Sequence, residues 1–80
     1  MRQILNGKWY DTEKAELIYE GSDPYQQFIR RYYRTTKGAF FCHYVNVGKL
    51  ELVSVEAMME ILAIHDVDKY MELFGEVEEG

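Results

Sequence analysis

The chain has 80 residues, a formal net charge of −5, 48% hydrophobic residues and one cysteine. This composition excludes a disordered chain, and we expect a single domain over residues 1–80 with a frayed acidic end at 76–80. A lone cysteine excludes an internal disulfide and favours a cytoplasmic location. Neither membrane insertion nor secretion is expected, because no apolar run is long enough to span a bilayer or to act as a leader.

The charge is distributed very unevenly along the chain. Residues 24–49 hold five basic residues and no acid, whereas residues 50–80 hold nine acids against Lys69 alone. Seven of the twelve aromatic residues also lie in the basic segment. A pattern of this kind concerns partners and association more than the fold.

Two elements are predicted before residue 22. Residues 3–10 are expected to form a hairpin, because Asn6-Gly7 is a strong two-residue turn signal between apolar residues. Residues 12–20 are predicted to form a helix, with Asp11 as its N-cap and Gly21 as its C-cap. The AELIYE stretch within this segment is also compatible with a strand.

The centre of the chain, residues 28–45, is predicted to form an antiparallel hairpin. Aromatic and basic residues alternate in the first arm, aromatic residues recur in the second, and Gly38 between them suits the left-handed position of a short loop. A turn at residues 22–24 precedes this hairpin, and residues 50–53 alternate as a third strand. Both faces carry aromatic residues, so we expect helices to cover one face and to leave the other available.

Two helices are predicted to complete the chain. Ser54 and Asp66 are good N-caps ahead of amphipathic stretches, and Gly75 ends the second helix. The expected fold class is therefore α+β. It consists of a small antiparallel sheet of three to four strands with an N-terminal helix and C-terminal helices packed on one face.

Acids of the C-terminal segment form the first candidate binding surface. Carboxylates four residues apart share one helix face, and the residues concerned are Glu56, Glu60, Asp68, Glu72 and Glu76. Such a stripe is suited to a protein surface of Arg and Lys that normally binds nucleic acid. The ordinary alternative is a solvated face on amphipathic helices.

The central hairpin forms the second candidate surface. Aromatic residues that stack on bases and arginines that bind phosphates are typical of single-strand binders. The basic residues concerned are Arg30, Arg31, Arg34 and Lys37. Direct nucleic-acid binding is disfavoured because the whole molecule is anionic, and we expect these side chains to pair with acids of the terminal helices. In a protein-binding role, the hairpin would supply the anchors Tyr32, Tyr33 and Arg34.

Catalysis and metal binding find little support in the sequence. Cys42 and His43 are neighbours on a predicted strand, so their side chains point to opposite faces and cannot act as nucleophile and base. His65 and its acidic neighbours lack the repeated ligand spacing of a zinc site, and His65 is expected at a helix end. We therefore expect no enzyme, no cofactor and no metal.

Three segments resemble a loose group of small uncharacterised proteins from bacteria, phages and other mobile elements. They are Gly7–Ala15 with the YDTEKA motif, Tyr33–Phe41 with the pattern YRTxKGxFF, and the acidic Phe74–Glu78. Members of that group often carry a longer insert where this chain has little between Gly21 and Tyr25. The resemblance implies a small protein that acts inside a bacterial host cell.

Small acidic proteins in that setting often inhibit host defence, as anti-CRISPR proteins do. Resemblance and charge together predict a non-enzymatic protein-binding module of this type. Its expected partner is a protein with a basic nucleic-acid-binding surface, such as a CRISPR effector. A nucleic-acid-binding or regulatory domain built on residues 28–45 is the alternative, and a homodimer formed through an edge strand is a third hypothesis.

Overall fold

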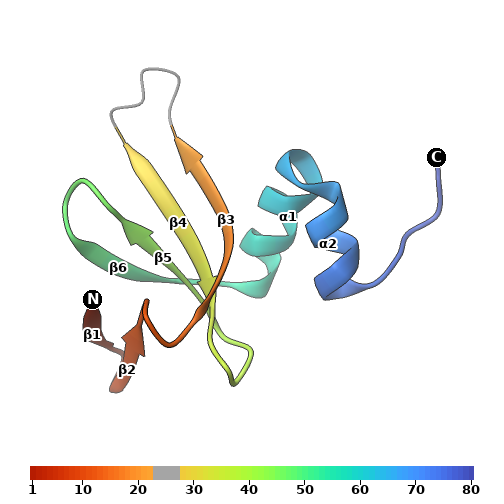
Figure 1. Cartoon of the computed structure of the whole chain (residues 1–80). Helices are drawn as coiled ribbons and strands as arrows, with labels where there is room; N and C mark the ends of the chain where they lie inside the picture. The colour runs from red at the N-terminus through yellow and green to blue at the C-terminus, as the bar shows by residue number, and fades with distance from the viewer. Residues whose placement is uncertain (23–27) are drawn as a thin grey trace.

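A four-stranded antiparallel sheet lies between a two-stranded hairpin and a pair of helices (Figure 1). The computed structural model describes residues 1–22 and 28–80, and the turn predicted around Asp23 lies outside them. The strands are β1 Arg2–Leu5, β2 Lys8–Asp11, β3 Glu16–Ser22, β4 Ile29–Arg34, β5 Phe40–Tyr44 and β6 Lys49–Val53. The helices are α1 Val55–His65 and α2 Val67–Phe74. The predicted α+β class with a small antiparallel sheet is confirmed.

The N-terminal hairpin forms as its turn signal predicts. Asn6 and Gly7 have φ angles of 53° and 80°, so both central residues of the turn are left-handed. Two successive left-handed residues give a turn whose twist matches that of the flanking strands, and the Asn-Gly pair tolerates this geometry best. Strands β1 and β2 pair around it, with Ile4 opposite Trp9.

The helix predicted over residues 12–20 is wrong, because this segment contains strand β3. Asp11 does cap a turn, since its Oδ1 accepts a hydrogen bond from the Glu13 amide at 2.9 Å and its carbonyl accepts one from the Lys14 amide at 3.1 Å. That turn ends after a few residues, and the chain then pairs antiparallel with β4 from Glu16 onward. A nine-residue helix would be marginal alone, whereas the strand pairs with β4 on both sides of an irregularity at Ile18 and buries that side chain.

The central hairpin has the expected strands, and its register places Arg34 opposite Phe40. Thr35 donates to the Ala39 carbonyl at 2.8 Å, and Gly38 adopts the left-handed conformation with φ 88°. Tyr32 lies opposite Cys42, and these two share the face that packs against Ile18 of β3 and against Met58 and Leu62 of α1. The helices therefore cover one face of the sheet, as predicted.

The opposite face of the sheet is covered as well, by the N-terminal hairpin. Tyr33 and Phe41 stack with their ring centroids 5.2 Å apart, and Tyr10 of β2 meets Phe41 edge-on at 5.5 Å. Leu50 of β6 completes this second cluster of buried residues. The expectation that one face of the hairpin stays available is therefore wrong, because the two sides of the sheet carry separate hydrophobic cores.

The two helices begin and end at the predicted residues. Ser54 Oγ accepts from the Ala57 amide at 3.1 Å, Asp66 Oδ1 accepts from the Lys69 amide at 3.1 Å, and Gly75 follows the last turn of α2. His65 closes α1 and stacks on Tyr19 of β3, with ring centroids 5.7 Å apart. Neither helix in the described part of the chain is long and apolar enough to cross a membrane.

A side-chain amide ties the N-terminal hairpin to the edge of the sheet. Gln3 of β1 donates from Nε2 to the Gly48 carbonyl at 3.0 Å and accepts at Oε1 from the Leu50 amide at 2.9 Å. These two backbone groups flank Lys49 on the outer side of β6. The hairpin is thus held to the sheet by a polar contact at β6 in addition to the aromatic packing beneath it.

Candidate functional site

The acids predicted as a partner-binding stripe all reach solvent. Glu56 and Glu60 lie on α1, Asp68 and Glu72 on α2, and Glu76 just after α2, and each is exposed. Within residues 1–22 and 28–80, only Glu72 of these five is ion-paired, to Lys69 of the same helix at 3.1 Å. Four of the five charges therefore lie in water with no basic partner among the residues that the structure describes.

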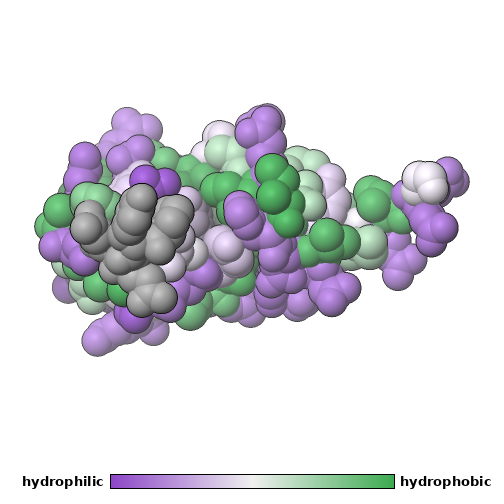
Figure 2. All heavy atoms as spheres, turned by 90° about the horizontal axis from the view of Figure 1, so that it is seen from above, coloured by the Kyte–Doolittle hydropathy of each residue, from purple (hydrophilic) through white to green (hydrophobic). Residues whose placement is uncertain are grey.

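Exposed apolar residues lie close in sequence to these acids, at the junction of α1 and α2. Ile64 near the end of α1 is 77% exposed, and Val67 at the start of α2 is 48% exposed. Hydrophobic and hydrophilic side chains are consequently mixed over the helical end of the molecule, on the right in Figure 2. We call the five acids together with Ile64 and Val67 the acidic helical surface. Sequence reasoning overlooked the two apolar residues, because it assigned the apolar positions of both helices to the core.

The three arginines of the central hairpin have partners, although not those expected. Arg31 pairs with Glu20 at 2.6 Å and Arg34 with Glu16 at 3.8 Å, both acids of β3. Arg30 lies over the ring of Tyr44 at 5.3 Å. In the part of the chain that the structure describes, no ion pair joins the hairpin to either helix, so the predicted pairing with acids of the terminal helices is wrong. Strand β3, which was predicted as a helix, supplies the acids.

Tyr32 and Tyr33 are not surface anchors. Each is only 8% exposed, and each belongs to the hydrophobic core on its own side of the sheet. Their assignment as partner-binding anchors is corrected for this reason, and the same burial removes a stacking platform for bases. Arg34 is partly exposed but engaged by Glu16, and Lys37 lies exposed in the loop between β4 and β5.

Cys42 and His43 do point to opposite faces of β5. Cys42 is buried under α1, and burial raises the pKa of its thiol to about 11. His43 is partly buried on the other face, where desolvation and the positive charge of Arg31 lower its pKa. A neutral, inaccessible thiol is a poor nucleophile. The two side chains therefore do not form a nucleophile–base pair.

Cys42 is expected to resist a water-soluble thiol reagent at pH 8 in the folded protein and to react fully once the chain is unfolded in urea. Because the folded pKa of about 11 lies above the ordinary value of 9.0, the contribution of the neutral thiol to stability is intact below pH 9 and is lost as the pH rises through about 11. Timed labelling followed by mass spectrometry measures the first effect. Rapid labelling of the native protein would contradict the buried position.

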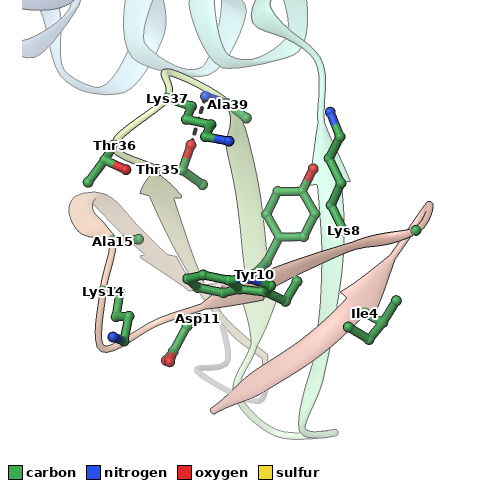
Figure 3. A pocket seen from close by; sticks show the side chains of 12 residues that line it. Ile4, Lys8, Tyr10, Asp11, Lys14, Ala15, Thr35, Thr36, Lys37 and Ala39 are labelled. Carbon is green, nitrogen blue, oxygen red and sulfur yellow. Dashed lines mark hydrogen bonds between the residues drawn. The ribbon is translucent and has the colours of Figure 1, made fainter.

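A pocket of about 530 Å³ lies between the N-terminal hairpin and the loop that joins β4 to β5 (Figure 3). Its lining combines apolar residues, Ile4, Trp9 and Ala15 among them, with the side chains of Lys8, Lys14 and Lys37. The lining residues come from two segments that are distant in the sequence, residues 4–15 and residues 35–39. Sequence reasoning named only Lys37 of these lysines, because the others come from separate segments of the chain.

The remaining ligand-type residues have structural contacts. Asp66 caps α2 and His65 stacks on Tyr19, and among the described residues no three His, Cys, Asp or Glu side chains gather in a way that could hold a metal ion. Comparison with known proteins identifies no matching family model, no matching curated protein and no matching solved structure.

Proposed function

We propose that the protein is a non-enzymatic binding module whose acidic helical surface occupies the basic, nucleic-acid-binding surface of a partner protein. The observation that carries the proposal is that four of its five acids have no ion-pair partner among the described residues, while Arg31 and Arg34 of the hairpin pair with acids of β3. The negative charge of the C-terminal segment is therefore available to a partner.

The chemistry of this surface suits competition with a polyanion. Several unpaired carboxylates create a negative field that accelerates encounter with a positively charged groove and rejects anionic partners. Ile64 and Val67 add apolar area at the same end of the molecule, and such area contributes affinity that charge alone does not supply. The acidic helical surface thus has charges that speed the encounter with a basic partner and apolar side chains that add affinity once the two are in contact.

We propose the class of partner from the resemblance of three segments to proteins of mobile elements. A small anionic protein in that setting is suited to inhibit a host defence complex, such as a CRISPR effector, by covering the groove that receives nucleic acid. An anti-CRISPR type of inhibition in the bacterial cytoplasm is therefore the specific form of the proposal. Direct nucleic-acid binding through residues 28–45 is less well supported, because the tyrosines are buried and Arg31 and Arg34 are paired.

The double substitution Glu56→Lys and Glu60→Lys is expected to reduce partner capture at least about tenfold, because two attractive contacts become repulsive. The immobilised protein should retain a basic nucleic-acid-binding protein from a bacterial lysate, and added double-stranded DNA should release it by competing for the same groove. Quantitative mass spectrometry of the retained protein measures both effects. The melting temperature should change little, since both side chains are exposed.

The double substitution Glu13→Lys and Glu16→Lys provides a control with the same change in net charge at a different place. Both acids are exposed and lie in the turn and strand that follow the N-terminal hairpin. Glu16 also pairs with Arg34 at 3.8 Å, an exposed ion pair that contributes less than about 1 kcal/mol, so the melting temperature of this variant is measured as well. This control variant should capture the partner nearly as well as the unaltered protein. Equal losses in the two variants, or tight salt-sensitive binding of DNA by the protein itself, would refute the proposal.

A further inference from the structure

The outer face of the N-terminal hairpin carries large apolar side chains that lie in solvent. Ile4 of β1 and Trp9 of β2 are direct cross-strand partners, so both side chains point to the same side of the hairpin. Ile4 is 69% exposed and Trp9 is 54% exposed, whereas Tyr10 is buried with Phe41 beneath the hairpin. A tryptophan beside an isoleucine on one small exposed face is typical of a surface that binds another protein.

An arginine is held on the same hairpin by this tryptophan. The guanidinium of Arg2 lies over the indole of Trp9, 5.9 Å from the ring centroid, and Arg2 forms no ion pair with any residue that the structure describes. Asp11, its cross-strand partner, is almost fully buried and accepts from the Glu13 amide at 2.9 Å. A guanidinium ordered on a ring keeps the N–H donors of its plane for a carboxylate.

The exposed charged side chains of the hairpin are all basic. Within residues 1–11 these are Arg2 and Lys8, and the one acid of this segment is the buried Asp11. The chain as a whole has a net charge of −5. The hairpin is therefore a basic and apolar surface on an anionic protein.

A surface of the opposite charge lies at the other end of the same molecule. The acidic helical surface combines acids that mostly have no ion-pair partner among the described residues with Ile64 and Val67, which are 77% and 48% exposed. The sheet separates the hairpin from the two helices, and each side of the sheet has its own core (Figure 1). The two surfaces of one molecule therefore cannot meet each other, but each can meet the matching surface of another copy.

We infer that the N-terminal hairpin docks on the acidic helical surface of a second copy of this chain. Ile4 and Trp9 cover Ile64 and Val67, and Arg2 is placed among the acids of α1 and α2. Because the two docking surfaces differ, the contact is heterologous, and every terminal copy keeps one surface free for the next. The second copy thus competes for the surface that the proposed function gives to a basic partner, but its docking does not depend on that partner.

Self-association of this kind is measured by sedimentation velocity of the unaltered protein. At low salt the average mass is expected to rise continuously with protein concentration, because a head-to-tail contact does not close on itself. At about 1 M NaCl, where the Debye length is about 3 Å, it should fall towards the 9.5 kDa of the monomer. Trp9 is the only tryptophan, so its emission should shift to shorter wavelength over the same concentration range.

Two variants, each with one surface altered, test which surfaces meet. Ile4→Thr with Trp9→Thr alters the hairpin and retains residues that favour strands, and Glu56→Lys with Glu60→Lys alters the acidic helical surface. Each variant alone should self-associate at least about tenfold more weakly than the unaltered protein. Their equimolar mixture should form a 1:1 complex, because each variant keeps the surface that the other lacks. Leu17→Thr, which removes a side chain of β3 that is 48% exposed, is the matched control and should leave self-association unchanged.

Any of three results would refute the head-to-tail contact. They are a monomer at every concentration and salt, undiminished self-association of the Ile4→Thr, Trp9→Thr variant, and no complex in the mixture of the two variants. All substituted side chains are exposed, so a preserved melting temperature separates loss of the contact from loss of the fold. The hairpin variant should still capture the basic partner, so failure of self-association is distinguishable from failure of the proposed function.

Discussion

Phe41→Ala is expected to destabilise the protein by about 3–5 kcal/mol, the largest effect of any single substitution proposed for this chain. The Phe41 side chain is 0% exposed, stacks on Tyr33 and meets Tyr10 edge-on, so its loss removes the centre of the core beneath the N-terminal hairpin. An 80-residue domain has a total stability of about 4–12 kcal/mol. The variant is therefore expected to unfold at low urea concentration, and equilibrium denaturation measures the shift.

Two comparison variants make the Phe41 result specific. Phe41→Leu retains an apolar side chain and loses the two ring contacts, so it should fall between the alanine variant and the unaltered protein. Val47→Ala removes an apolar side chain that is already exposed in the turn before β6, and should change stability by less than about 0.5 kcal/mol. Equal stability of the Phe41→Ala and Val47→Ala variants would contradict a packed core on this side.

Leu62→Ala is expected to cost about 2–5 kcal/mol by loosening the helices from the sheet. Leu62 is fully buried with Met58 against Ile18, Tyr32 and Cys42, so α1 is held to the sheet by few side chains. Thermal unfolding followed by circular dichroism measures the loss of helix. We expect the Leu62→Ala variant to melt at a lower temperature than the unaltered protein and to lose more of its helical signal at any given temperature.

Ile64→Ala is the matched control for Leu62→Ala, because it removes a similar side chain two residues later on the same helix. Ile64 is exposed, so this change should stay within about 0.5 kcal/mol of the unaltered protein. If both alanine variants were equally stable, α1 would not be anchored by the contacts described. A loss of partner capture by Ile64→Ala without loss of stability would in addition support its place in the acidic helical surface.

The features that the sequence predicted well are those fixed by local chemistry. Asn6-Gly7 requires a particular turn, Gly38 suits a left-handed loop position, and Ser54 and Asp66 cap helices with their own side chains. Each of these signals acts over a few residues. The exposure of the acids on α1 and α2 was predictable for the same reason, since it follows from helical spacing.

The features that the sequence predicted poorly depend on contacts between segments that are distant along the chain. The helix over residues 12–20 was predicted from its caps, Asp11 and Gly21, but pairing with β4 makes residues 16–22 a strand. This pairing brings Glu16 and Glu20 to the hairpin arginines. Tyr33 is buried because the N-terminal hairpin folds over the sheet, which no local pattern indicates. The pocket between the N-terminal hairpin and the loop from β4 to β5 is lined by residues from separate segments, so no local pattern predicts it either.

The amide of Gln3 has a consequence for how the sheet can grow. An incoming strand at β6 would need the Gly48 carbonyl and the Leu50 amide, and Gln3 already occupies both. The Gln3 side chain therefore hinders the pairing of a further strand with β6 at this edge of the sheet. Among the described residues β4 is the one strand neighbour of β3, so we expect a strand added by a second copy or a partner peptide to pair at β3, the opposite edge of the sheet.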